Sequence, residues 1–177
     1  APAEIADAEL YESGGLTIAI PKADLDSLIV VTDDAKADSE GLLITVYEKK
    51  SYEDSKADYG EDSAAGLLFS IVRYTRAQYE QFLCSDGSGK SFFAKDDTYY
   101  YGLLTPTDVQ FYRSGMTSVD QSSDDMKAWQ ALNEGCTATR DDFTLRNHLE
   151  AYSDREFFDR QFTYDSEHLY AAYYPYY

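Results

Sequence analysis

This 177-residue chain is poor in the side chains that most often carry catalytic or metal chemistry: it has two cysteines, two histidines, two methionines and one tryptophan. Neither His148 nor His168 stands in a zinc-binding spacing such as His-Glu-x-x-His, so we expect no metal site of that kind. Cys84 and Cys136 allow one disulfide at most, and their positions leave open whether they pair. No apolar run approaches the length of a membrane-spanning helix.

Basic residues are also scarce, because 15 lysines and arginines face 33 aspartates and glutamates, for a formal net charge of -18. Such a charge repels nucleic-acid phosphates and anionic membrane surfaces and keeps a monomer soluble. The acids are spread along the whole chain, as on a solvated surface. The sequence therefore predicts a monomer with neither a nucleic-acid partner nor a membrane-spanning segment.

The usual motifs of phosphate and hydrolase chemistry are missing or incomplete. Ser85–Ser91 is similar to a phosphate-binding loop, but Cys84 stands where its first glycine belongs, and the expected order is helix, loop, strand. Neither Gly-x-Ser-x-Gly nor Ser-x-x-Lys occurs. We expect no cofactor. Two alternatives stay open: a small hydrolase built on carboxylates or on Cys84 or Cys136, and a calcium-dependent domain using paired acids such as Asp33–Asp34.

Aromatic residues are abundant, with 17 tyrosines and nine phenylalanines, and 44% of the chain is hydrophobic. Disordered chains carry few aromatics, so this composition indicates a folded globular domain. Residues 1–12 are small and acidic and are expected to form a flexible spacer. Residues 13–177 are then expected to form a single domain.

Alternating apolar residues predict strands in the first half of the chain, separated by an acidic polar loop at Thr32–Gly41. Gly66–Tyr74 has apolar residues on both faces and is predicted to be central in a sheet. Asp96–Asp97 is expected to be the turn of a hairpin. The predicted strands lie in Leu16–Ile20, Leu28–Val31, Leu42–Lys49, Gly66–Tyr74 and Ser91–Leu104, with a final hairpin within Arg160–Tyr177.

Helix start and stop signals predict helices mainly in the second half. Thr75 and Gln78 have the spacing of a capping box, and Pro106 stands at the first position of a predicted helix. One expected helix begins at Ser51 and ends by Gly60. The others span Arg76–Leu83, Thr105–Tyr112, Ser122–Glu134 and Thr139–Tyr152. Because strands and helices mix without regular βαβ alternation, the predicted class is α+β, with a mainly antiparallel sheet and several helices packed against it.

The tyrosines are the best candidates for contact with a partner, since an exposed phenol ring offers a flat amphipathic surface to protein or glycan. Tyr99-Tyr100-Tyr101 is predicted to alternate across a strand, so that Tyr100 faces away from its neighbours. Arg73 is a candidate partner for an anion. The predicted binding residues are Arg73, Tyr99, Tyr101, Tyr173, Tyr174 and Tyr176, with no catalytic or metal-binding residue assigned.

Two stretches of the chain, residues 66–83 and 91–113, carry a resemblance to a known group. The first reads GLLFSIVRYTRAQYEQFL; the second includes YYYG at 99–102 and TPTDVQFYR at 105–113. Together they resemble uncharacterised secreted or lipid-anchored proteins of anaerobic Gram-positive gut bacteria. This resemblance implies export and tethering at the cell surface upstream of Ala1. It implies no activity and assigns no catalytic residue.

These observations favour an extracytoplasmic domain that binds a protein or glycan, or joins a surface assembly, without catalysis. The small hydrolase and the calcium-dependent domain remain the alternatives.

Overall fold

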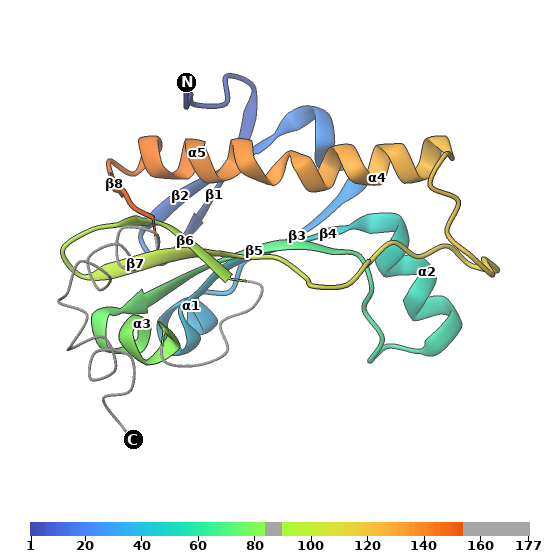
Figure 1. Ribbon diagram of the computed structural model, residues 1–177, viewed down its shortest axis with the longest axis horizontal. Helices are drawn as coiled ribbons and strands as arrows, with labels where there is room; N and C mark the ends of the chain where they lie inside the picture. The colour runs from blue at the N-terminus through green and yellow to red at the C-terminus, as the bar shows by residue number, and fades with distance from the viewer. Residues whose placement is uncertain (84–89, 154–177) are drawn as a thin grey trace, which may run out of the picture.

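The computed structural model describes residues 1–83 and 90–153 of the protein. Six antiparallel strands form its main sheet (Figure 1). The strand order is β3-β4-β5-β7-β6-β8, and a separate hairpin pairs β1 with β2. This architecture confirms the predicted α+β class. The strands are β1 (Ala8–Ser13), β2 (Leu16–Pro21), β3 (Leu28–Val31), β4 (Leu42–Glu48), β5 (Leu67–Thr75), β6 (Lys90–Lys95), β7 (Tyr99–Leu104) and β8 (Glu150–Ala151).

Helices cover both faces of the sheet. The helices α4 (Asp124–Glu134) and α5 (Cys136–Arg146) run almost end to end along one side, where α5 packs on β2 (Figure 1). On the opposite side lies α3 (Arg76–Leu83), whose Tyr79 ring stacks on Tyr100 with centroids 4.2 Å apart. Tyr101 instead packs edge to face on Phe143 of α5. The predicted alternation of the three tyrosines is thereby confirmed.

The core lies between the sheet, the hairpin and the α4–α5 layer. Phe143 is fully buried, and Trp129 of α4 packs edge to face on Phe111. β5 lies between β4 and β7, as predicted for the strand with two apolar faces. The core cluster includes Ile18, Ile20, Ile44, Val46, Phe69, Ile71, Phe93, Tyr101, Met126 and Phe143.

Several local predictions are confirmed. α3 has the expected bounds, and its capping box is formed: Thr75 N–H donates to Gln78 Oε1 at 2.9 Å, and Gln78 N–H donates to Thr75 Oγ1 at 3.3 Å. The hairpin β6–β7 turns at residues 96–98. There Asp96 Oδ1 accepts from the backbone N–H groups of Thr98 and Tyr99. These signals act between neighbours in sequence, so the sequence alone is enough to specify them.

The predicted loop at Thr32–Gly41 is wrong, because residues 34–40 form a helix, α1 (Asp34–Glu40). Asp33 caps its start by accepting from the N–H groups of Ala35 and Lys36. Gly41 ends it in the left-handed region, with φ 71°. The polar composition concealed a capped helix that buries only Ala37.

The helix predicted at Thr105–Tyr112 is also wrong, because residues 105–123 are irregular. Backbone groups of Gln110 and Tyr112 bond to distant parts of the chain. Gln110 C=O accepts from Gly66 N–H at 2.9 Å, and Tyr112 N–H donates to Ser51 Oγ at 2.8 Å. These bonds to the region of α2 (Lys49–Tyr59) outweigh the local helix-start signal of Thr105-Pro106.

The flexible spacer predicted for residues 1–12 is wrong over its second half, because Ala8–Ser13 is β1, paired with β2. Ahead of this strand, Ile5 N–H donates to Asp142 Oδ2 on α5 at 2.7 Å. The partner of β1 is the adjacent β2, joined to it through Gly14 and Gly15, both of which have positive φ. Leu10 and Tyr11 belong to this strand, although the composition around them is that of a linker.

The helix predicted at Thr139–Tyr152 begins and ends earlier, as α5 ends at Arg146. Asn147 then pairs with β2: its Oδ1 accepts from Thr17 N–H at 2.9 Å and its Nδ2 donates to Thr17 C=O at 2.8 Å. His148 follows with φ 53°, a conformation incompatible with continuing the helix.

Within residues 1–83 and 90–153, every helix is too short or too polar to span a lipid bilayer. The final hairpin predicted within Arg160–Tyr177 lies outside the described residues.

Candidate binding site

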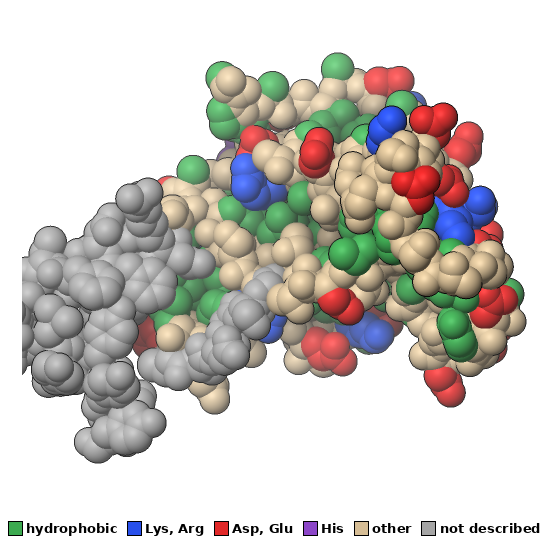
Figure 2. All heavy atoms as spheres, turned by 45° about the vertical axis from the view of Figure 1, so that its right-hand side comes forward, with side chains coloured by type: hydrophobic (Ala, Val, Ile, Leu, Met, Phe, Trp, Pro, Cys, Tyr) green, Lys and Arg blue, Asp and Glu red, His purple; other side chains and the backbone are tan. Residues whose placement is uncertain are grey.

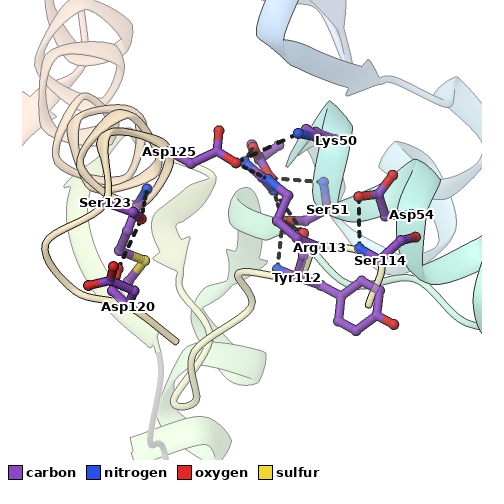
Figure 3. Close-up of polar contacts among 11 residues, drawn as sticks. Lys50, Ser51, Asp54, Tyr112, Arg113, Ser114, Asp120, Ser123 and Asp125 are labelled. Carbon is purple, nitrogen blue, oxygen red and sulfur yellow. Dashed lines mark hydrogen bonds and ion pairs between the residues drawn. The ribbon is translucent and has the colours of Figure 1, made fainter. Parts of the chain in front are cut away.

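The most heavily bonded polar group of the described chain is the side chain of Arg113, which lies in the irregular segment between β7 and α4 (Figure 3). Its two terminal nitrogens donate hydrogen bonds to the Glu48 carboxylate, Nη2 to Oε1 at 2.7 Å and Nη1 to Oε2 at 3.0 Å. The two side chains are only 13% and 7% exposed. A bidentate pair this deeply buried is charge-assisted and fixed in direction.

Glu48 is placed by the junction of two elements. It is the last residue of β4 and the N-cap of α2, where its Oε2 accepts from Ser51 N–H at 2.9 Å. One carboxylate therefore caps a helix and neutralises a buried cation. The sequence had predicted that this helix begins at Ser51; Ser51 instead lies inside α2, and its Oγ binds the backbone of Tyr112.

Asp125 completes the cluster from the first turn of α4. Arg113 Nε donates to its Oδ2 at 2.7 Å, and Lys50 Nζ lies 3.6 Å from the same oxygen (Figure 3). The hydrogen bond from Arg113 lowers the pKa of Asp125, more than its slight burial raises it. Burial lowers the pKa of Arg113, but the hydrogen bonds to Glu48 and Asp125 raise it by more than burial lowers it. The pKa of Arg113 therefore lies above its ordinary value. Arg113 and Asp125 are therefore both charged over the physiological pH range.

A pocket of about 320 Å³ opens beside this cluster, between the turn before β3, the start of α2 and one face of α4. Carboxylates and amines lie side by side on this end of the molecule, with apolar side chains between them (Figure 2). The pocket combines Arg113, Glu48, Asp125, Lys50 and Asp26 with Ser27, Lys49, Glu53, Ala128, Trp129 and Leu132.

The chemistry of this pocket suits binding better than acid–base catalysis. A general acid needs a carboxyl pKa raised towards neutrality, whereas that of Asp125 is lowered. The Glu48 carboxylate already accepts from Arg113 and Ser51. The pocket offers a fixed pattern of charges and an apolar wall.

On the other side of the same segment, Tyr112 and Tyr59 form a surface ring pair. Their centroids are 5.6 Å apart, and Tyr112 Oη donates to Asp58 Oδ2 at 2.6 Å. This hydrogen bond raises the pKa of Tyr112. Tyr59 is 71% exposed. The pair is thus presented to solvent, with the Tyr112 hydroxyl bonded to Asp58 and the Tyr112 backbone N–H bonded to Ser51 Oγ.

Of the predicted binding residues, Tyr101 is buried at 1% exposure, so the expectation that its ring is exposed is wrong. Its ring lies under α5, and its hydroxyl donates to Asp96 Oδ2 at 2.6 Å. Burial and this hydrogen bond raise its pKa. The strand alternation that the sequence revealed did not show which face a helix covers.

Arg73 and Tyr99 lie together, but their predicted binding role stays a prediction. The Arg73 guanidinium stacks over the Tyr99 ring at 4.6 Å from its centroid and donates from Nη1 to Gly14 C=O at 2.8 Å. Its anionic neighbour is Asp38 of α1, 3.6 Å away. The Arg73 side chain is 10% exposed and joins β5 to the hairpin turn and α1.

The remaining predicted contact residues lie outside the described residues: Tyr173, Tyr174 and Tyr176. Cys84 does too, while Cys136 is a partly buried free thiol whose pKa is raised by burial. A thiol in that state is a weak nucleophile at neutral pH. Within the described ranges, no group of three or more potential metal-ligating side chains comes together.

Sequence analysis did not single out Arg113, Glu48 or Tyr59. The partners are far apart in sequence: 65 residues separate Arg113 from Glu48. One general expectation could have pointed to such a pair. A carboxylate buried in the fold needs a cationic partner, and arginine is the cation best suited to a buried pair.

In comparisons with known proteins, no family model, no curated protein and no solved structure matches this chain.

Proposed function

We propose that this chain is a non-catalytic binding domain that contacts a protein partner through the exposed Tyr59–Tyr112 ring pair. One observation carries the proposal: a large aromatic side chain, Tyr59, is 71% exposed and packs on a ring that is itself anchored. Exposed tyrosines on a rigid support are typical anchors of protein interfaces, because little side-chain entropy is lost when they bind.

The surroundings of the ring pair favour a protein over a glycan. Val109, in the same irregular segment as Tyr112, is 59% exposed. An exposed aliphatic side chain in this segment adds apolar area of the kind found at the centre of protein interfaces. The buried Glu48–Arg113 ion pair fixes this irregular segment to the end of β4.

The ionisation states of Arg113, Asp125 and Cys136 support a role without catalysis. Arg113 and Asp125 hold each other charged, and the Cys136 thiol is protonated at neutral pH. The resemblance of residues 66–83 and 91–113 supports placing the contact outside the cytoplasm.

Site-directed photo-cross-linking tests the proposal. A benzoylphenylalanine placed at Tyr59, in the organism that makes the protein, is expected to give one discrete protein adduct. The matched control places the same residue at Leu145 on α5, which is 41% exposed. Added wild-type protein should compete the adduct away, and a Tyr59→Ser/Val109→Ser variant should not.

Adducts of equal yield at both positions, or equal competition by the double variant, would contradict the proposal. A glycan array gives the second readout. Binding to one glycan class that Tyr59→Ser abolishes would reassign the ring pair to sugar recognition.

A further inference from the structure

The outer edge of the main sheet is an apolar strand with an open side. β3 is the first strand in the sheet order and, among residues 1–83 and 90–153, pairs with β4 alone. Its sequence is Leu28-Ile29-Val30-Val31, with no charged residue and no proline, and Val31 is 45% exposed. Such an edge offers unpaired backbone groups to another extended chain.

The direction of the backbone groups follows from neighbouring bonds. Leu28 of β3 lies opposite Glu48 of β4 in the register. Glu48 N–H donates to Gly66 C=O, so it points away from β3 and does not bond to Leu28. Leu28 N–H accordingly bonds to Leu25 C=O and not to β4. Alternate residues of a strand direct their backbone groups to the same side, so Val30 also directs its N–H and C=O to the outer edge.

Carboxylates bracket this strand at both ends. Asp24 and Asp26 precede it in η1 (Lys22–Ser27), and Asp34 begins the helix that follows. In the part of the chain that the structure describes, these three side chains form no ion pair and accept no hydrogen bond. Asp33 is different, because it caps α1.

These charges decide what the edge can accept. Pairing β3 with β3 of a second copy would bring two such acidic clusters together, on chains that each carry a net charge of -18. Like charges brought to one interface oppose this pairing, while a basic segment meets attraction at both ends. We propose that β3 is a docking edge for an extended, cationic protein segment, which adds to the main sheet as a further antiparallel or parallel strand.

This docking edge is independent of the Tyr59–Tyr112 pair, so either proposal can fail without the other. The backbone bonds of the added strand give affinity, and the flanking carboxylates select its charge. The apolar side chains of β3 supply the surface against which alternate side chains of the segment pack.

The test uses the full chain and a fluorescent, N-acetylated nonapeptide of alternating lysine and valine as the probe. We expect saturable binding by fluorescence anisotropy, weakened by added salt. In ¹⁵N-labelled protein, the Val30 amide should exchange with solvent more slowly once the peptide is bound. A peptide with glutamate in place of lysine should not bind.

A lysine–valine peptide N-methylated at every residue keeps its charge but has no backbone N–H to donate to the edge of β3. We expect it to lose binding. Equal binding of the methylated and unmethylated peptides would overturn the proposal, as would absence of binding up to about 1 mM. This comparison uses wild-type protein, so it does not depend on any variant folding.

Two protein variants locate the site. Val30→Pro removes the outward N–H, and an edge strand tolerates proline where its N–H faces solvent, so binding should be lost in a folded protein. Asp24→Asn/Asp26→Asn/Asp34→Asn should weaken binding about five- to tenfold. Its control, Glu9→Gln/Asp62→Asn/Asp97→Asn, makes the same charge change at exposed sites elsewhere and should bind as wild type does.

Equal weakening by both triple variants would show attraction to the net charge alone and overturn the site. Dimerisation of the wild-type chain that Val30→Pro abolishes would assign the edge to a second copy, which also overturns the proposal.

Discussion

The carboxylate of Glu48 and the guanidinium of Arg113 face each other through two parallel hydrogen bonds of 2.7 and 3.0 Å, with both side chains nearly excluded from solvent. This single contact joins the end of β4, the start of α2 and the irregular segment before α4. The pocket and the tyrosine pair lie on the two sides of the segment that it holds.

Removing one partner of this pair should destabilise the protein strongly. Glu48→Ala leaves the Arg113 charge buried and uncaps α2, so we expect a loss of about 3–5 kcal/mol in the free energy of unfolding. Urea denaturation measures it. A Glu48→Leu/Arg113→Met variant should recover part of that loss, because it buries no unpaired charge.

The matched control is the exposed i,i+4 pair Arg76–Glu80, whose Arg76→Ala variant should leave the free energy of unfolding nearly unchanged. Similar losses from the two pairs would contradict the role given to the buried one.

Gly41, at the end of α1, should not be replaceable by any residue with a side chain. A Cβ added at Gly41 would lie 2.1 Å from Arg73 C=O, in a residue with φ 71°. We expect Gly41→Ala to cost about 2 kcal/mol or more in thermal or urea unfolding, since strained backbone and a backbone clash add.

Gly15→Ala is its control, because Gly15 also has positive φ but no atom within 4 Å of an added Cβ. It should cost only about 1 kcal/mol, the backbone share alone. A Gly15→Ala variant as damaged as Gly41→Ala would show that conformation, and not the contact, sets the cost.

The Asn147 side chain should be irreplaceable even by its nearest isostere. It donates to Thr17 C=O and Phe143 C=O and accepts from Thr17 N–H. Aspartate keeps the acceptor but sets a second oxygen against two carbonyls, so Asn147→Asp should cost about 2–3 kcal/mol in urea unfolding. If Asn147→Asp matches wild type, the link between α5 and β2 is not a source of stability.

The Asp96 carboxyl should make the protein less stable in acid. Burial raises its pKa, but bonds from the Tyr101 hydroxyl and the backbone of Tyr99 and Thr98 lower it more. Because the folded pKa lies below the unfolded value, this stability is fully present above the unfolded value and is lost as pH falls through the folded pKa. Asp96→Asn should flatten this part of the curve of unfolding free energy against pH.

Carboxyl-carbon NMR tests the cause directly. Tyr101→Phe should raise the pKa of Asp96 towards its ordinary value by removing one bond to the carboxylate. Tyr100→Phe is the control, since Tyr100 points to the opposite face, against Tyr79. If the Asp96 pKa is unmoved by Tyr101→Phe, the phenol bond does not set it.

Much of the sheet could be predicted because its signals are local. β2, β5 and α3 were found from alternating apolar residues, from two apolar faces and from a capping box. Each of these patterns lies within a few consecutive residues.

The errors came where distant partners compete with local preferences. Residues 105–112 carry a helix-start signal, yet their backbone bonds to Gly66 and Ser51 instead. Likewise, the tyrosine triplet showed its alternation but not that Tyr101 is on the face covered by α5.

By itself, the sequence determined the α+β class, the acidic exterior and most strand positions, because periodicity, capping and composition are properties of short segments. Only the tertiary structure decided which tyrosines reach solvent, where Arg113 finds its carboxylate and which strand ends the sheet. Those outcomes depend on contacts between segments far apart in the chain, whose free energies are settled by packing and burial and not by neighbours in sequence.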